Sequence, residues 1–524
     1  MHPRPALVAA ALLSAVRGAV AVETQEREIP PAFGPHVNLS EADFVRAKTF
    51  RASDRIVGTY YFYWYDAETK AHLIDGDGSD ALTTHPSSTE GFSYKSVAWH
   101  GRQMEDMMAA GIDVALPVFW GGPSEHEANA HNHWSFAGLR PLVKAREELL
   151  RSARRGGREP PRIGLFYDTS TLQFNAWGTH VDLATDYGRR WFYATVRDFF
   201  SMIPPAHWAM IDGRPIVLLY SAAFAKRHDQ GAIDYCREQF AREFGGRVPW
   251  IAREVSWRVA ADGTVAWGGA LGLKNPGIAS LGPGYDHSAV PGRAPLVVDR
   301  EGGAFYERNW VRFLRRPSNF VMLETWNEFH EGTDIAESRE YGRQYIELTR
   351  KYTDLFRRGE KPPLPKGKYT GAREISIQLA SADDSRGLRR VENADGVTEP
   401  TSVDGEVARS SKPVPGRIRY AYFAADDSFK AAEAQGYELE VEYLDASAGR
   451  LGLEFDGSDR DAPFEGAYSP SPVTAELSGS GSWATATFPL PGARLLNSQN
   501  GGADFRLVVD ADEFLVRRVV LRRQ

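Results

Sequence analysis

Three carboxylates lie close together in the segment ETWNEFHEGTDI, which spans residues 324–335. They are Glu324, Glu328 and Glu331, and the apolar run 319–323 before them is typical of a buried strand. Carboxylates that follow such a strand would stand at the mouth of a barrel, where catalytic groups gather. Rings beside acids suit a pyranose, because its apolar face stacks on rings while acids act on the glycosidic oxygen. The segment therefore indicates acid–base chemistry on a sugar.

The elements around this segment alternate between apolar strands and amphipathic helices. Eight expected strands over about 300 residues are typical of the α/β class and of a (β/α)₈ TIM-type barrel, which we place at residues 51–360 after a lead-in at 22–50. A doubly wound sheet is the alternative, but no glycine-rich phosphate turn follows the first strand. The expected strands are 56–65, 113–119, 162–167, 216–220, 250–253, a short one near Ala270, 279–282 and 320–324. The expected helices are 96–110, 139–155, 182–202, 233–244, 305–314 and 338–358.

The pattern changes after a linker rich in proline and lysine at residues 361–371. Beyond it apolar residues recur at every second position, as in Tyr437–Tyr443, where glutamates occupy the alternate places. Short half-buried strands of this kind predict an all-β sandwich at residues 372–524. We expect it to be galactose-binding-like, and both a carbohydrate-binding and a purely structural role are open. Trp483 is the candidate ring for stacking on a sugar.

Charge and composition exclude some partners. A net charge of −7 and a pI near 6.1 argue against nucleic acid. The single cysteine, Cys236, cannot form a disulfide within the chain and is expected to be a buried thiol.

Residues 1–21 resemble a signal peptide, with basic residues, an apolar run at 6–16 that is too short to span a membrane, and a small-residue end at Ala21. We expect a secreted or periplasmic monomer without a membrane partner.

Further acids and rings follow other expected strands. Each of them alone could be structural, but together they predict an aromatic-walled pocket for a glycan. The candidate substrate contacts outside the 324–335 segment are Tyr63, Trp64, Trp120, Tyr167, Tyr285 and Asp286.

The sequence carries no strong metal or cofactor motif. His126, His131 and His133 lie near Glu125 and Glu127, but without the fixed spacing that a zinc site requires. No serine stands in a G-x-S-x-G turn. We therefore expect neither a metal nor a cofactor.

From about Arg55 to Arg358 the chain resembles family-99 glycoside hydrolases, the endo-α-mannosidase family, and related domains of bacterial polysaccharide clusters. The matching segments are YYFYWYD, DVALPVFWGGPSE, IDGRPIVLLY, GPGYD and WNEFHEGTDI, with Phe329 where the family usually has tryptophan. The resemblance implies retaining hydrolysis of an α-linked, mannose-containing glycan. It implies that Glu328 is a base on the sugar's 2-hydroxyl, giving a 1,2-anhydro sugar, and that Glu331 is the acid/base. Glu324 and Tyr285 would line the same subsite, and we count Asn327 and His330 as substrate contacts.

The spacing of the two glutamates agrees with this division of roles. Two carboxylates three residues apart cannot both ionise easily, so one pKa should rise toward that of an acid while the other group stays charged. Two alternatives stay open. One is an ordinary two-carboxylate retaining mechanism with Glu328 as acid/base, and the other is a non-catalytic glycan-binding protein.

Overall fold

The computed structural model describes residues 26–153, 159–293, 296–363, 366–393, 395–403, 405–414, 416–430 and 436–524. The expected signal peptide lies outside the described residues. The chain divides into two compact units. One contains the described residues up to Ala270 together with Asn275–Lys361, and the other contains Leu271–Lys274 and the described residues from Pro362 onward.

The first unit is a (β/α)₈ barrel, as predicted. Its strands pair in parallel in the order β8-β7-β6-β4-β2-β1-β12-β9. The two end strands approach each other as well, since the Ile278 amide donates to the Thr264 carbonyl at 2.8 Å. The barrel strands are β1 (Ile56–Tyr61), β2 (Val114–Phe119), β4 (Leu165–Tyr167), β6 (Arg214–Leu219), β7 (Trp250–Glu254), β8 (Gly263–Val265), β9 (Ala279–Leu281) and β12 (Phe320–Leu323). Shorter strands are β3 (Arg162–Ile163), β5 (Met210–Ile211), β10 (Tyr285–Asp286) and β11 (Val297–Val298).

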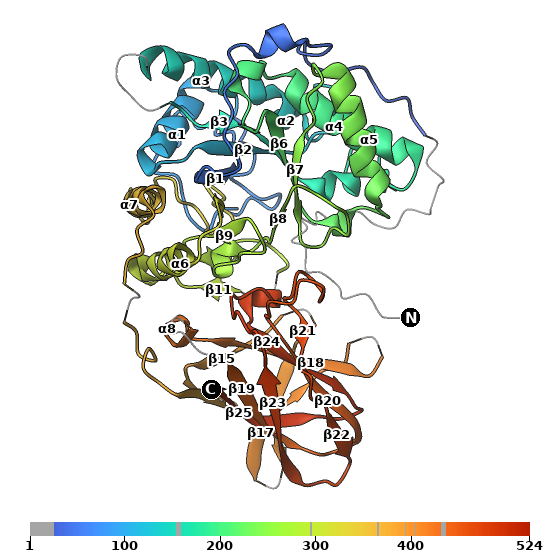
Figure 1. Cartoon of the computed structure of the whole chain (residues 1–524), viewed down its shortest axis with the longest axis vertical. Coiled ribbons are helices and arrows are strands. Elements are labelled where there is room, and N and C mark those ends of the chain that lie inside the picture. The colour runs from blue at the N-terminus through green and yellow to red at the C-terminus, as the bar shows by residue number, and fades with distance from the viewer. Residues whose placement is uncertain are drawn as a thin grey trace. The chain divides into compact units, whose positions relative to one another are not determined.

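Helices surround the barrel strands (Figure 1). Within the described residues, the segments between β7 and β8 and between β8 and β9 contain no α-helix, which agrees with their weak helical pattern. The helices are α1 (Val97–Ala110), α2 (His133–Ala137), α3 (Leu139–Ala153), α4 (Asp186–Ser201), α5 (Gln230–Glu243), α6 (Ala304–Arg315) and α7 (Gln344–Arg358). The 3₁₀ turns of this part of the chain are η1 (Glu41–Phe44), η2 (Pro123–Glu125), η3 (Thr169–Leu172), η4 (Pro205–His207), η5 (Ala222–Phe224), η6 (Gly269–Leu271) and η7 (Glu301–Gly303).

Local sequence explains these elements. Every residue of β1 and β2 is buried, as expected for parallel strands covered on both faces. Helix α1 begins where the Ser96 hydroxyl accepts from the Trp99 amide and ends at Gly111, whose φ of 87° requires glycine. Cys236 on α5 is buried as expected, and burial raises the pKa of its thiol to about 12.

Several elements differ from the sequence-based expectation. Helix α4 begins at Asp186 rather than at residue 182, and α5 begins at Gln230 rather than at residue 233. Ala270 lies in η6 rather than in a strand, and the sixth barrel strand is β8, whose Gly-Thr-Val sequence has no apolar run. The first strand ends at Tyr61 rather than at residue 65, because the next amide, that of Phe62, donates to the Asn327 side chain. The last helix begins at Gln344, after Gly342 turns the chain with a φ of 54°.

The second unit is the predicted β-sandwich, with two antiparallel sheets. Among the described residues, one sheet joins β13, β14, β16, β17, β19, β23 and β25, and the other joins β15, β18, β20, β21, β22 and β24. Alternate apolar residues of both sheets form its core. The strands are β13 (Glu374–Gln378), β14 (Asp384–Arg386), β15 (Leu388–Val391), β16 (Thr398–Val403), β17 (Glu406–Ser411), β18 (Ile418–Ala425), β19 (Tyr437–Leu444), β20 (Ala448–Phe455), β21 (Ser469–Pro470), β22 (Ala475–Ser478), β23 (Trp483–Leu490), β24 (Phe505–Asp510) and β25 (Leu515–Arg523), with α8 (Asp427–Lys430) and η8 (Asn500–Gly502) between them. No helix in the described part of the chain is long and apolar enough to cross a membrane.

Candidate active site

The loop after β12 carries the two candidate catalytic glutamates and is held by backbone hydrogen bonds. The Thr325 amide donates to the Thr333 carbonyl at 2.9 Å, and the Trp326 amide donates to the Tyr60 carbonyl at 2.9 Å. Gly332 turns the loop with a φ of 53°, at a point where a Cβ would lie 3.2 Å from the Asp286 carbonyl oxygen. These contacts fix the loop against β1 and β10.

Glu328 is buried and bonded to His330. One carboxylate oxygen accepts from His330 twice, from the amide at 3.1 Å and from the ring Nδ1 at 2.6 Å. Burial raises the pKa of Glu328, and the imidazole opposes this rise. Burial lowers the pKa of His330, but the carboxylates of Glu328 and Glu331 outweigh it, so this pKa lies above its usual value. The pair therefore shares a proton, and an imidazolium leaves Glu328 ionised.

Glu331 is paired with a cation that the sequence did not indicate. Its carboxylate lies 2.6 Å from Arg293 Nη1, and both side chains are 16% exposed. The same Arg293 nitrogen donates to the Tyr285 hydroxyl at 3.3 Å, which also lies 3.0 Å from His287 Nδ1. Burial and the charge of Glu331 raise the pKa of Tyr285, so this phenol stays protonated. Glu331, Arg293 and Tyr285 thus form one hydrogen-bonded group.

Glu324 lies deeper, at the end of β12. It is 1% exposed, and its carboxylate accepts from the Gly268 amide at 2.9 Å and from the Ser280 hydroxyl. Burial raises the pKa of Tyr60, and the negative charges of Glu324 and Glu254 raise it further. Glu324 therefore belongs to the floor of the site.

One wall of the site is aromatic. The Trp64 ring stacks on His72 at 4.7 Å and meets Trp120 and His330 edge to face at 5.2 and 5.5 Å. The Trp120 indole donates to Asp168 at 2.5 Å, and burial raises the pKa of that carboxyl. These contacts bring the predicted residues Trp64, Trp120 and His330 together.

A second group of rings was missed by the sequence reasoning. Trp267 stacks parallel to Phe166 at 5.6 Å and lies against Tyr60 and Tyr220 at 4.9 and 5.1 Å. Burial raises the pKa of Tyr220, and the carboxylates of Asp168, Glu331 and Glu254 add to this rise. The ends of several strands therefore converge around Tyr220.

Some of the residues that the sequence reasoning missed could have been found from the sequence pattern, and others could not. Tyr220 and Glu254 stand at the ends of expected strands, so the rule that selected Tyr167 could have selected them as well. Trp267 and Arg293 lie in segments without regular periodicity, and no pattern points to them.

Three other predicted residues form hydrogen bonds within the protein, and a fourth packs its ring against a neighbour. The Tyr63 hydroxyl donates to the Ser135 carbonyl at 2.6 Å. The Asn327 amide accepts from and donates to the Phe62 backbone at 2.8 and 2.7 Å. Asp286 accepts from the Ser288 amide at 2.8 Å, and the Tyr167 ring packs on Phe192 at 5.3 Å. These contacts position the strand ends, and a direct sugar contact by these residues stays a prediction.

Glu125 and His126, which follow β2, have partners within the protein. Glu125 is buried and accepts from the Asn132 and Ala176 amides at 2.9 and 2.8 Å. His126 Nε2 lies 2.5 Å from the Asp198 carboxylate. No group of three or more His, Cys, Asp or Glu side chains within the described ranges could hold a metal ion.

The contact between Glu328 and His330 leads to a prediction about the pKa of His330. In the Glu328→Gln variant the pKa of His330 should fall, because burial then acts with much less opposing charge. Nuclear magnetic resonance of histidine-labelled protein would follow this titration. His85, which lies between Asp80 and Glu340, is the internal control and should keep its raised pKa. An unchanged His330 titration would contradict the assigned pairing.

A family model described as "Domain of unknown function (DUF5010)" matches residues 42–363, and no curated protein matches the chain. Among solved structures the chain is similar to the GH99 endo-α-mannosidase from Bacteroides thetaiotaomicron, at 16% identity over 58% of this chain and 98% of that one, with a TM-score of 0.41. A glycoside hydrolase-like protein matches at 16% identity over 61% and 99%, with a TM-score of 0.43. The C-terminal CBM6 of LamC from Zobellia galactanivorans matches at 11% identity over 29% and 99%, with a TM-score of 0.18. Because the DUF5010 match covers more than half of the sequence, the chain belongs to the DUF5010 family.

Proposed function

We propose that this protein is a retaining glycoside hydrolase that acts on an α-linked, mannose-containing glycan. The observation that carries the proposal is the pair of carboxylates on one loop, with Glu328 bonded to His330 and Glu331 bonded to Arg293, beside the aromatic wall. Rings bind the apolar face of a sugar, and two carboxylates are what glycosidic cleavage requires.

In the proposed reaction, Glu328 removes the proton of the 2-hydroxyl, and O2 attacks C1. The bond from C1 to the glycosidic oxygen breaks as Glu331 gives that oxygen its proton. Glu331 then takes a proton from water, and the water oxygen opens the 1,2-anhydro sugar at C1. The proton held by Glu328 returns to O2. Two inversions at C1 give net retention.

The contacts of Glu328 favour this order of steps, whereas the contact of Glu331 adds a requirement to it. His330 as imidazolium supports an ionised Glu328, which is the form that a base needs. Arg293 holds the Glu331 carboxylate in an ion pair at 2.6 Å, whereas an acid must present a proton to the leaving oxygen. The proposal therefore requires Arg293 to part from Glu331 when the sugar enters.

A glycan panel tests the function. The purified full chain would be incubated with α-mannans and other bacterial and plant glycans, and the first-formed anomer would be read by nuclear magnetic resonance. The proposal expects an α-linked mannose-containing substrate and an α-anomer as the first product. A β-anomer, or no turnover of any glycan, would contradict it.

One observation favours a second assignment of roles. The carboxyl whose pKa burial raises is Glu328, which suits an acid/base in an ordinary two-carboxylate mechanism. That mechanism passes through a glycosyl-enzyme. A covalent adduct trapped with a 2-fluoro sugar and located by mass spectrometry would establish it.

We also propose that the chain is exported and that its sandwich binds glycan. The ring chosen from the sequence is a poor platform, since Arg517 covers Trp483 at 4.1 Å and the indole packs beside the buried Leu444 and Leu515. Tyr420, which is half-buried on β18 with Arg506 at 3.9 Å, is a better candidate. Affinity electrophoresis in polysaccharide gels would compare the full chain with a Tyr420→Ala variant, and equal mobility would argue against this site.

Trp267→Ala should lower kcat/KM about 10-fold or more, because a stacked ring contributes on the order of 1–2 kcal/mol. The loss should fall mainly on KM, since the ring holds sugar without moving a proton. Phe174→Ala, which removes an exposed ring, is the matched control. A kcat/KM equal to that of the control would remove Trp267 from the site.

A further inference from the structure

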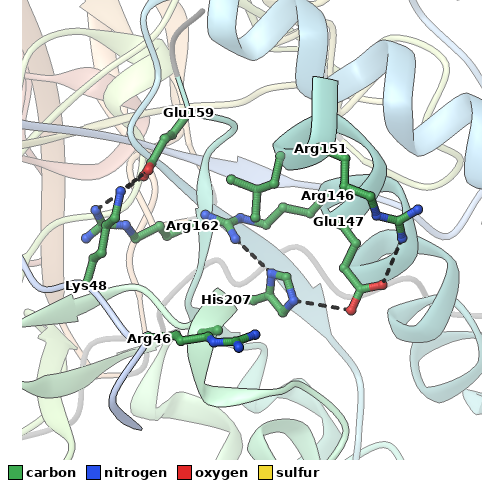
Figure 2. A pocket seen from close by; sticks show the side chains of 10 residues that line it. Arg46, Lys48, Arg146, Glu147, Arg151, Glu159, Arg162 and His207 are labelled. Atoms are coloured by element: carbon green, nitrogen blue, oxygen red, sulfur yellow. Dashed lines mark hydrogen bonds and ion pairs between the residues drawn. The ribbon is translucent and has the colours of Figure 1, made fainter. Parts of the chain in front are cut away.

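A cavity lies at the end of the barrel opposite to the candidate active site. Its volume is about 600 Å³. It is lined by the first residue of β3, the second half of α3, the end of η4 and the segment that precedes β1. Parallel strands begin at this end, whereas Glu328 and Glu331 follow the end of β12. Its basic side chains are Arg46, Lys48, Arg146, Arg151 and Arg162, and His207 lies among them (Figure 2).

The cavity carries excess positive charge. Five arginine or lysine side chains line it, against the two carboxylates Glu147 and Glu159. Glu159 pairs with Lys48 and lies 3.7 Å from Arg162, and Glu147 lies 3.8 Å from Arg151. Arg46 is exposed and forms no ion pair with any described residue. Of the five cations, Arg46 and Arg146 are therefore left without a paired carboxylate.

Arg146 is buried without an anionic partner. It is 2% exposed and donates to the Pro161 carbonyl at 2.8 Å, to the Pro160 carbonyl at 3.3 Å and to His207 Nδ1 at 2.8 Å. Burial first, and then Arg146, lower the pKa of His207 to about 4, so the ring is neutral at pH 7 and its Nδ1 accepts. All three partners are uncharged, and a buried guanidinium is costly unless an anion compensates it.

Arg162 lines the same cavity and has a free donor. Its Nη1 is buried and has no hydrogen-bond partner in the structure. Its guanidinium lies over the Phe50 ring at 4.5 Å, which holds the side chain in place. Arg146 and Arg162 repel each other, and burial followed by this repulsion lowers the pKa of Arg146 to about 10.

We propose that this cavity binds a sugar that carries a phosphate or sulfate ester. Arginine donors match the oxygens of such tetrahedral anions, and the free Arg162 donor supplies one of the bonds. A volume of about 600 Å³ is far larger than the ion alone and falls within the range of small-molecule sites. This inference does not depend on the proposed hydrolase activity.

Isothermal titration calorimetry, with the full chain at constant ionic strength, would measure ligand binding and test the proposal. The probes are glucose 6-phosphate, glucose 6-sulfate, unsubstituted glucose and inorganic phosphate. Saturable binding of an ester, with glucose silent and inorganic phosphate at least 10-fold weaker, is expected. The two esters distinguish a phosphate from a sulfate ligand. No saturable binding of either ester would overturn the proposal, and equally tight binding of inorganic phosphate would reduce the site to one for a free ion.

Variants locate the binding. Arg162→Met should weaken ester binding about 10-fold or more, since it removes a charge-assisted hydrogen bond. Arg46→Met and Arg151→Met change exposed side chains and should each weaken it about 3-fold while leaving the fold intact. Arg386→Met removes the same charge from an exposed site in the sandwich and should have no effect. Equal affinities in all four variants would place the ester elsewhere and refute the assignment.

Discussion

Glu331→Gln is expected to lose on the order of 10²–10⁴ in kcat for a natural glycan, because a general acid contributes that much and an amide has no proton to give. The same variant should release fluoride or nitrophenol in the first turnover at close to the wild-type rate, since these leaving groups need no protonation, and should slow only at the water step, where Glu331 is the base. Stopped assays on both substrates, with circular dichroism to confirm the fold, would measure the contrast.

Arg293 gives this prediction a control. Arg293→Met removes the side chain that lies 2.6 Å from Glu331 without changing the candidate acid itself. This variant should therefore keep the wild-type ratio of activity on natural and activated substrates, because Glu331 still has a proton to give. Arg343→Met, which removes an exposed cation far along the chain, should leave both activities unchanged. If Glu331→Gln slows the first turnover of activated and natural substrates equally, Glu331 is not the acid.

The sequence was sufficient to predict the barrel because most of its strands and helices have a recognisable pattern of apolar residues. Strands such as Val114–Phe119 are continuous apolar runs, and helices such as α4 repeat their apolar face every three or four residues. The sixth unit could not be found in this way. Gly263–Val265 has neither a run nor a period, and it is a strand because β7 offers it a parallel edge. Tertiary pairing decided its structure.

The residues of the candidate site also differ in whether the sequence could predict them. Glu324, Glu328 and His330 could be predicted because they share a single loop, so their proximity is local. Arg293 could not, because its approach to Glu331 depends on the path of an irregular segment some forty residues earlier in the chain.

Spacing alone did not say which glutamate of the pair would have the raised pKa. It predicted only that one carboxyl would have a raised pKa, and the role of Glu331 as acid/base came from the resemblance to family-99 glycoside hydrolases. Burial raises the pKa of Glu328, whereas Glu331 is less buried and lies beside Arg293. Burial and long-range ion pairs, which a one-dimensional spacing does not contain, decide such shifts.

Glu328→Gln is expected to be inactive on natural and activated substrates alike. In the proposed mechanism this carboxylate activates the 2-hydroxyl, and that step is needed however good the leaving group is. A loss on the order of 10²–10⁴ in kcat on both substrate types is expected from removal of a general base. Glu105→Gln, which makes the same change in an exposed acid of α1, is the control for a loss of charge alone.

A 2-deoxy substrate completes this test, because it removes the reacting group from the sugar rather than from the protein. Under the proposed mechanism, the wild-type protein should not hydrolyse a 2-deoxy glycosyl fluoride, since no O2 is present to attack C1. Ordinary two-carboxylate hydrolysis needs no O2 as nucleophile and should still turn over the 2-deoxy substrate. If the wild type cleaves it and Glu328→Gln does not, Glu328 acts directly on the anomeric carbon or on the leaving oxygen, and the 1,2-anhydro route is excluded. If neither protein cleaves it while both bind it, the reaction requires the 2-hydroxyl, as the contact between Glu328 and His330 leads us to expect.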